Sequence, residues 1–191
     1  MSSSRRISVP VLVAIALLTV ACQFGTEESV SVADLERAQA TLAPFKEQLV
    51  DALIGALNEG SPESAIHVCR DRAPEIAAQL SVNGVRMGRT SHKTRNPGNA
   101  PESWVEPLLA AYLENPTHTT PRAVFIDDAT LGYVEPIYVM PFCLSCHGPA
   151  IEPALLEEIQ SIYPQDQATG FKANDLRGLF WVTLPLSEEG T

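Results

Sequence analysis

The pattern with the clearest chemical meaning in this sequence is Cys143-Leu144-Ser145-Cys146-His147. Two cysteines three residues apart, followed directly by a histidine, form the attachment pattern of a c-type haem. On one turn of chain the two thiols can reach the two vinyl groups of a porphyrin, while the histidine directs its imidazole at the iron as an axial ligand. The motif therefore predicts one covalently bound haem c.

Three other interpretations of this motif fit the sequence less well. A thioredoxin-like redox pair belongs beside a βαβ pattern at the start of a helix, and the sequence does not offer that context. A zinc site needs a second pair of ligands at a suitable spacing, and none is evident. A disulfide between Cys143 and Cys146 would close a very small loop under strain.

The N-terminal residues have the layout of an export signal. Arg5 and Arg6 precede an apolar run that ends at Ala21, and this order of a basic start and an apolar stretch is typical of secreted proteins. The run is shorter than the roughly 20 apolar residues that a membrane-spanning helix needs. We therefore expect residues 1–21 to be a signal peptide, cleaved after export to an oxidising compartment.

Cys22 stands where a lipoprotein signal would be cut. Residues 18–22 read Leu-Thr-Val-Ala-Cys, which resembles the lipobox of bacterial lipoproteins, and acylation of Cys22 would anchor the mature chain in a membrane. An ordinary secretory signal cut nearby is the alternative. Gln23 replaces the aspartate that retains lipoproteins at the inner membrane, so the expected location is the outer membrane, facing the periplasm.

The mature chain is strongly acidic. Removal of residues 1–21 leaves 170 of the 191 residues, enough for one domain with a core of its own. It also takes Arg5 and Arg6 from the 13 basic residues, so that 11 basic side chains remain with 23 acidic ones and the formal net charge is −12 with histidine neutral. Because such a surface repels phosphate backbones, nucleic acid is not an expected partner.

The iron's second axial position has six candidate ligands. Helical periodicity favours Cys69, which lies in the middle of an apolar stripe with spacings of three and four residues. His67 lies two positions earlier, about 200° round the helix, and faces elsewhere. Cys69 could also be no more than a small buried hydrophobe, but an unpaired thiol in an exported protein and an iron that accepts thiolate favour ligation. The other candidates are His92, His118, Met87 and Met140.

We expect these four remaining candidates to have other roles. His92 and His118 lie in polar stretches and are predicted to be surface histidines. Met87 falls in a predicted strand and is assigned to the core. Met140 is too close in sequence to the attachment motif to cross the haem plane.

Basic residues cluster between positions 86 and 95, where four of the 11 basic residues of the mature chain occur. In so acidic a protein this suggests a site for anions, and the haem propionates are the nearest ones expected. Arg89 is the first candidate; a solvated loop with local salt bridges is the alternative. The other three residues of the cluster are Arg86, Lys93 and Arg95.

Four aromatic side chains could line the haem site, although core packing is expected for most of them. They are Trp104, Tyr138, Phe142 and Trp181.

The elements that must position these residues begin with helices. Apolar residues spaced by three and four predict a helix over 33–58. Ser61 can cap a second helix, with Pro62 at its first position, that reaches Leu80. Further helices are expected over 102–114 and 153–163.

Strands dominate the later part of the chain. β-branched and aromatic residues predict strands over 85–91, 123–126, 132–140 and 178–186, with the middle two as a hairpin. Helices followed by an antiparallel sheet are typical of an α+β fold. The expected organisation is a signal peptide over 1–21, a short tether over 22–32 and one haem domain over 33–191.

Several further blocks of the sequence are distinctive: Val68-Cys69-Arg70, 73–77, 88–101 with Trp104, 143–148, 163–164, 166–170 and 175–178. Through these blocks the sequence resembles the Tll-type c-haem domain family over about residues 33–186. The resemblance implies a PAS-like antiparallel sheet with helices packed at one side, haem on the cysteine motif, and axial ligation by His147 and Cys69. It also implies an unsettled physiological role, because the family is catalogued as a domain of unknown function and its domain recurs as the sensory part of signalling proteins.

These features predict the chemistry of the centre. A thiolate adds negative charge at the iron and favours the ferric state, so we expect a low-potential monohaem cytochrome that transfers single electrons or senses redox poise, with an unidentified redox partner protein. The alternative is a haem-based sensor, in which CO or NO displaces Cys69 and a partner protein receives the signal. Catalysis is not expected, because bound Cys69 would block the open position that an enzyme needs.

Overall fold

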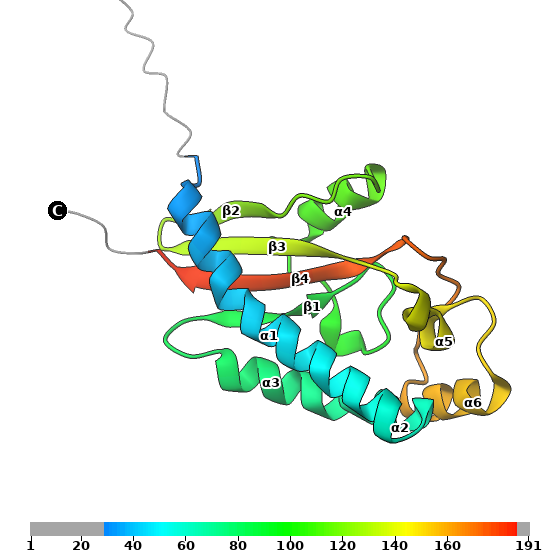
Figure 1. Cartoon of the computed structure of the whole chain (residues 1–191). Coiled ribbons are helices and arrows are strands. Elements are labelled where there is room, and N and C mark those ends of the chain that lie inside the picture. Colours follow the sequence, from blue (N-terminus) through cyan, green and yellow to red (C-terminus); the bar gives the residue numbers. More distant parts are fainter. Residues whose placement is uncertain (1–28, 187–191) are drawn as a thin grey trace, which may run out of the picture.

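The computed structural model describes residues 29–186 (Figure 1). Residues 1–21, the predicted lipidation site Cys22 and most of the predicted tether lie outside this range. Within it, no helix is both long and apolar enough to cross a membrane. The described part is an α+β fold in which helices pack against one antiparallel sheet, as predicted from the order of elements.

Helix α1, Val32–Glu59, confirms the first predicted helix. It begins where the Oγ of Ser31 accepts a hydrogen bond from the backbone N–H of Asp34 at 3.1 Å, which satisfies one of the free N–H groups of the first turn. Its apolar stripe is buried against the sheet and forms the main core with side chains of β1, β3 and β4. The fully buried residues of this stripe are Ala38, Leu42 and Phe45, followed by Leu49 at 5% exposure.

The sheet has four antiparallel strands in the order β1-β4-β3-β2. β2 (Arg122–Asp127) and β3 (Thr130–Tyr138) form the predicted hairpin. β4 (Leu176–Pro185) lies between β3 and β1 (Arg86–Thr90), so it joins two segments that are far apart in the sequence. The register of β3 against β4 shifts between Ile137 and Tyr138.

The two faces of the sheet have separate cores. α1 and α3 (Ala73–Leu80) cover one face, and α1 crosses the sheet obliquely (Figure 1). Lys46 of α1 also forms an ion pair with the carboxylate of Glu135 on β3. α4 (Glu106–Glu114) covers the other face, where it packs on Val134 and Leu179. The site described below lies at the end of the first face.

The predicted helix over 61–80 is present but contains a π-helical turn. It consists of α2 (Pro62–His67), a π-helical turn (Val68–Arg72) and α3 (Ala73–Leu80). Pro74 has no N–H to donate to the carbonyl four residues earlier, and the N–H of Ala73 bonds instead to the carbonyl of Val68, five residues back. The prediction gave the bounds of this helical segment but missed the π turn, because apolar periodicity alone does not register the missing donor.

Helix α4 also begins later than predicted. The chain turns at Glu102, whose carbonyl accepts a hydrogen bond from the N–H of Val105 at 2.8 Å, and α4 starts only at Glu106. Pro107 follows within the first turn, where a proline is tolerated because its N–H would be unpaired.

A long excursion from the sheet connects β3 to β4. It contains a 3-10 turn (Pro141–Cys143), α5 (Leu144–His147) and α6 (Pro153–Ile162). Backbone hydrogen bonds between Val139 and the pair Asn174 and Asp175, at 2.8 and 2.9 Å, bring its two ends together. α6 packs on Ile66 of α2, so the excursion folds back against the N-terminal helices (Figure 1).

Candidate functional site

A cavity of about 370 Å³ lies between the C-terminal part of α1, the π-helical turn, the sheet and α5. Its walls are mainly apolar, and Leu53 and Leu57 continue the α1 stripe into it. All five residues that the sequence singled out for the cofactor line this one cavity, although they come from four different segments. They are Cys69, Arg89, Cys143, Cys146 and His147.

The cysteine motif forms a tight turn at the cavity wall. The N–H of Cys143 bonds to the carbonyl of Met140 at 2.9 Å, and the N–H of Gly148 bonds to the carbonyl of Leu144 at 2.8 Å. A Cβ atom on Gly148 would lie 2.5 Å from that same Leu144 oxygen, so the turn needs glycine. Cys143 and Cys146 are free thiols, and burial raises the pKa of Cys146.

The imidazole of His147 is held in one orientation. Its Nδ1 lies 2.7 Å from the carbonyl oxygen of Ala168, which makes Nδ1 the donor and leaves the lone pair on Nε2 free for a metal. Phe171 meets the ring edge to face at a centroid distance of 6.3 Å. Burial lowers the pKa of His147 well below its usual range, and the charges of Arg177 and Arg95 add to this, so the ring is neutral.

The loop over 166–171 is fastened to the cysteine motif by Arg95. The guanidinium of Arg95 is buried, forms an ion pair with Asp166 at 3.1 Å, and donates from Nη2 to the carbonyl of Cys146 at 2.6 Å. Asp166 also accepts from the N–H of Ala168 at 2.8 Å. Arg95 was predicted as part of an anion-binding cluster, and the structure instead gives it a bracing role beneath His147.

Cys69 lies on the π-helical turn and is partly buried at the cavity wall. Single π turns inside helices occur often at functional sites, since they redirect a side chain. The Nη2 of Arg89 donates to the backbone carbonyl of Cys69 at 3.2 Å, which links this turn to β1.

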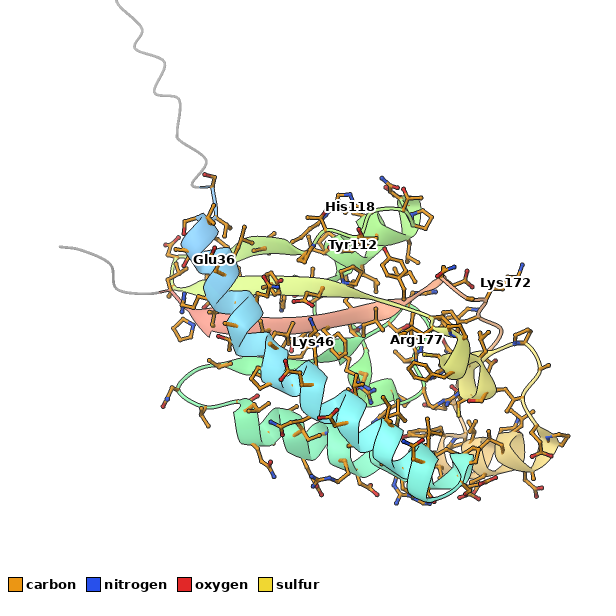
Figure 2. The ribbon with its side chains drawn as sticks, viewed as in Figure 1. Glu36, Lys46, Tyr112, His118, Lys172 and Arg177 are labelled. Atoms are coloured by element: carbon orange, nitrogen blue, oxygen red, sulfur yellow. The ribbon has the colours of Figure 1, made fainter. Side chains whose placement is uncertain are left out.

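Four of the other candidate ligands lie outside the cavity. His67 is exposed, with its Nε2 4.0 Å from Glu158, and His92 is exposed beside Phe171. Met87 is buried in the main core, as predicted. His118 is partly buried against Tyr112 rather than on the surface as predicted (Figure 2).

Met140 does line the cavity, but at its mouth, where the side chain is 55% exposed. It also stands only three residues before Cys143 in the attachment turn. Cys69 is thus the candidate that the structure brings inside the cavity from a separate element.

The remaining predicted residues divide between the two faces of the sheet. Tyr138 and Phe142 line the cavity, whereas Trp104 and Trp181 pack edge to face in the opposite core, with centroids 6.3 Å apart. Arg86 pairs with Glu102 away from the cavity. The Nζ of Lys93 lies 3.4 Å from the carbonyl of Thr169, at the 166–171 loop.

Arg177 is a cavity residue that was not singled out from the sequence. It stands in β4 and lines the cavity beside α5 (Figure 2). Burial lowers its pKa to about 10, and the charges of Arg89 and Arg95 act in the same direction. The strand was predicted to begin at Gly178, so Arg177 fell one residue outside it. Had the strand been predicted from Leu176, a charged residue within a mainly buried strand would have indicated a candidate site residue.

The arrangement suits a flat, largely apolar group with a metal at its centre. It offers two thiols on one turn, a neutral imidazole with a fixed tautomer, a third thiol from another element, and guanidinium groups for anionic substituents. These are the donors that a covalently attached iron porphyrin requires.

No curated protein matches the chain, but a solved structure and a family profile do. Among solved structures, "Crystal structure of the cyanobacterial heme-protein Tll0287" is similar, with a TM-score of 0.61 and 28% sequence identity, covering 84% of this chain and 100% of that one. The family profile described as Tll0287-like matches residues 21–185. The chain therefore belongs to the Tll0287-like family.

Proposed function

We propose that this protein binds one haem, attached covalently through Cys143 and Cys146. The observation that carries the proposal is the single cavity lined by both thiols, by an imidazole of fixed tautomer and by Cys69. The similar solved structure is named a haem-protein, which supports the same cofactor here. Each S–H bond would add across one vinyl group, with sulfur bonding to one carbon and hydrogen to the other, so attachment exchanges no electrons.

The axial ligands in this proposal are His147 and Cys69. His147 would bind through Nε2, since Nδ1 is engaged by Ala168. Cys69 would bind through its sulfur from the π-helical turn. Arg89, which lines the same cavity, would offer its guanidinium to a propionate of the haem.

The proposed role is low-potential electron transfer or redox sensing. The haem supplies a one-electron couple, and a thiolate ligand favours its ferric state. With Cys69 bound, the centre has no free position for a substrate, so we propose a carrier or sensor and not an enzyme. Phe142 and Met140, at 42% and 55% exposure, stand at the cavity mouth, where a redox partner protein could approach.

A second candidate function is sensing of CO or NO. The observation that favours it is the position of Cys69 on a π turn, because such turns can shift to a regular helix and move the side chain. Displacement of Cys69 by a gas would then change the helix that carries it. CO binding to the reduced protein would favour this function, and failure of CO to bind would favour electron transfer.

We also propose that the chain is exported and anchored through acylated Cys22. The support is the basic and apolar start of the sequence and the residues before Cys22. The acidic surface argues against a nucleic-acid partner. Replacement of Cys22 by serine should release the protein from the outer-membrane fraction; if Cys22→Ser stays there, the anchor is not this cysteine.

Intact mass of the natively matured protein tests the haem proposal. The expected result is one haem increment that survives denaturation and is absent after Cys143→Ala together with Cys146→Ala. Ser145→Ala is the matched control, since it changes a residue within the motif but keeps both thiols. A mature protein without the increment would overturn the proposal.

A further inference from the structure

The cavity holds three arginines, and only one of them has an acidic partner. Arg95 is paired with Asp166, whereas no carboxylate in the described part of the chain lies within ion-pair distance of Arg89 or Arg177. The site therefore carries two uncompensated positive charges in surroundings that are mainly apolar. Charges in such surroundings are costly unless they are paired.

Arg177 is partly buried at the cavity wall. Its Nη1 donates to the carbonyl of Lys93 at 3.2 Å, and its guanidinium lies over Phe171, 5.3 Å from the ring centroid. These contacts fix the plane of the group but supply no negative charge. Arg177 also lies beside the cysteine turn, since its charge acts on His147.

Arg89 is fixed in a similar way from the neighbouring strand. It donates one hydrogen bond, from Nη2 to the carbonyl of Cys69 at 3.2 Å. A guanidinium has five N–H donors, so most of the donors of Arg89, like those of Arg177, remain available to a ligand in the cavity. The two residues stand on adjacent antiparallel strands, β1 and β4.

We propose that Arg177 and Arg89 together bind the two propionate carboxylates of the haem, so that its anionic edge points into the protein at the β1–β4 wall. This inference rests on the proposed haem binding and adds the orientation of the group and a second cation. The two carboxylates match the two unpaired guanidiniums in number and in charge. Planar carboxylate and guanidinium groups also match in geometry, because they can form two parallel hydrogen bonds.

The alternative position of the propionates, directed to solvent, would leave both partly buried guanidiniums without an anion. The lowered pKa of Arg177 reflects that cost. The vinyl groups would be held separately, by the thiols of Cys143 at the end of the 3-10 turn and of Cys146 in α5. The strands and the cysteine turn would therefore hold different substituents of the porphyrin.

The test uses the full-length matured protein with ¹³C-labelled propionate carboxylates. The variants are Arg177→Gln and Arg89→Gln, and Arg72→Gln is the control because Arg72 is exposed and paired with Glu75. Infrared spectra report the carboxylate stretching bands, and a redox titration reports the ratio of reduced to oxidised protein. Intact mass reports whether haem is attached.

Both cavity variants should shift a carboxylate band, each affecting a different carboxylate, while Arg72→Gln leaves the bands unchanged. Loss of either positive charge should also lower the reduced-to-oxidised ratio at a fixed ambient potential by about tenfold, which equals about 59 mV for a one-electron couple. If Arg177→Gln does not fold, Arg177→Lys should keep the ratio near that of the parent protein but still shift the band.

The inference is wrong if haem-loaded Arg177→Gln, or Arg177→Lys in its place, has the carboxylate bands of the parent protein. It is also wrong if Arg72→Gln shifts them equally. A parent protein without attached haem would instead contradict the proposed function, and the mass measurement separates that outcome from the others.

Discussion

The two walls that present the proposed axial ligands differ in how firmly they are held. On the His147 side, the 166–171 loop, Arg95 and the turn at Gly148 form a network of hydrogen bonds and one buried ion pair. On the Cys69 side, a π-helical turn is linked to the sheet by a single hydrogen bond from Arg89. The difference indicates a fixed ligand on one side and an adjustable one on the other.

The network on the His147 side should dominate stability. Replacement of Asp166 by asparagine leaves the buried guanidinium of Arg95 without its anion, and breaking a buried pair in this way costs about 3–5 kcal/mol. We expect the free energy of unfolding to fall by about 3 kcal/mol in urea titrations. Glu75→Gln, at an exposed ion pair, is the control and should change it by less than about 1 kcal/mol. Equal effects would contradict the comparison.

The turn at Gly148 should be the next most sensitive position. Gly148→Ala brings a Cβ within 2.5 Å of the Leu144 oxygen, so the turn must open, and overpacking of this kind costs about 1–3 kcal/mol. Gly55→Ala is the matched control, because nothing lies within 4 Å of its Cβ and alanine favours the helix by about 0.5–1 kcal/mol. Thermal unfolding should show opposite shifts for the two variants.

The Cys69 side should respond in its coordination more than in its stability. Pro74→Ala restores the N–H that the π turn lacks and favours a regular helix at Cys69. The absorption spectrum of the ferric protein should therefore change, while the free energy of unfolding changes by less than about 1 kcal/mol. Pro62→Ala, at the start of α2, should leave the spectrum unchanged. If the Pro74→Ala spectrum equals that of the parent, the π turn does not control the coordination by Cys69.

The smallest effect is expected from His92, which lies against the 166–171 loop through Phe171. Although His92 is largely exposed, partial desolvation lowers its pKa in the folded state, and the charges of Lys93 and Arg177 act in the same direction. Below the usual pKa of 6.5 the unfolded chain binds more protons, so this group makes stability fall as the pH falls through that value. Unfolding of His92→Asn between pH 7 and 5 should show a weaker decline than the parent; an identical decline would exclude this contribution.

The same contrast explains what the sequence could predict. The cysteine motif, α1 and the β2–β3 hairpin follow from local spacing and alternation. The structure confirms the helix and the hairpin, and it places the motif and Cys69 at the same cavity. The hydrogen-bond acceptor for His147 is the backbone carbonyl of Ala168. Because every residue has a backbone carbonyl, the sequence does not indicate which one accepts this bond.

Two further features depended on long-range packing. Arg95 belongs to the same short basic stretch as Arg89, and only the fold shows that it meets Asp166, 71 residues later. Arg177 becomes a cavity residue because β4 pairs with β1, which local patterns do not reveal. The π turn is a local feature, but its signal is a missing donor at Pro74 and not a change in apolar spacing.

The most direct test of the account is the electron paramagnetic resonance spectrum of the ferric, natively matured protein, compared with that of Cys69→Ala. The account predicts a low-spin signal of a thiolate-ligated haem in the parent and its loss in Cys69→Ala, with the haem still attached. A parent spectrum without the thiolate signature, or one that Cys69→Ala leaves unchanged, would contradict the pairing of a fixed His147 with an adjustable Cys69.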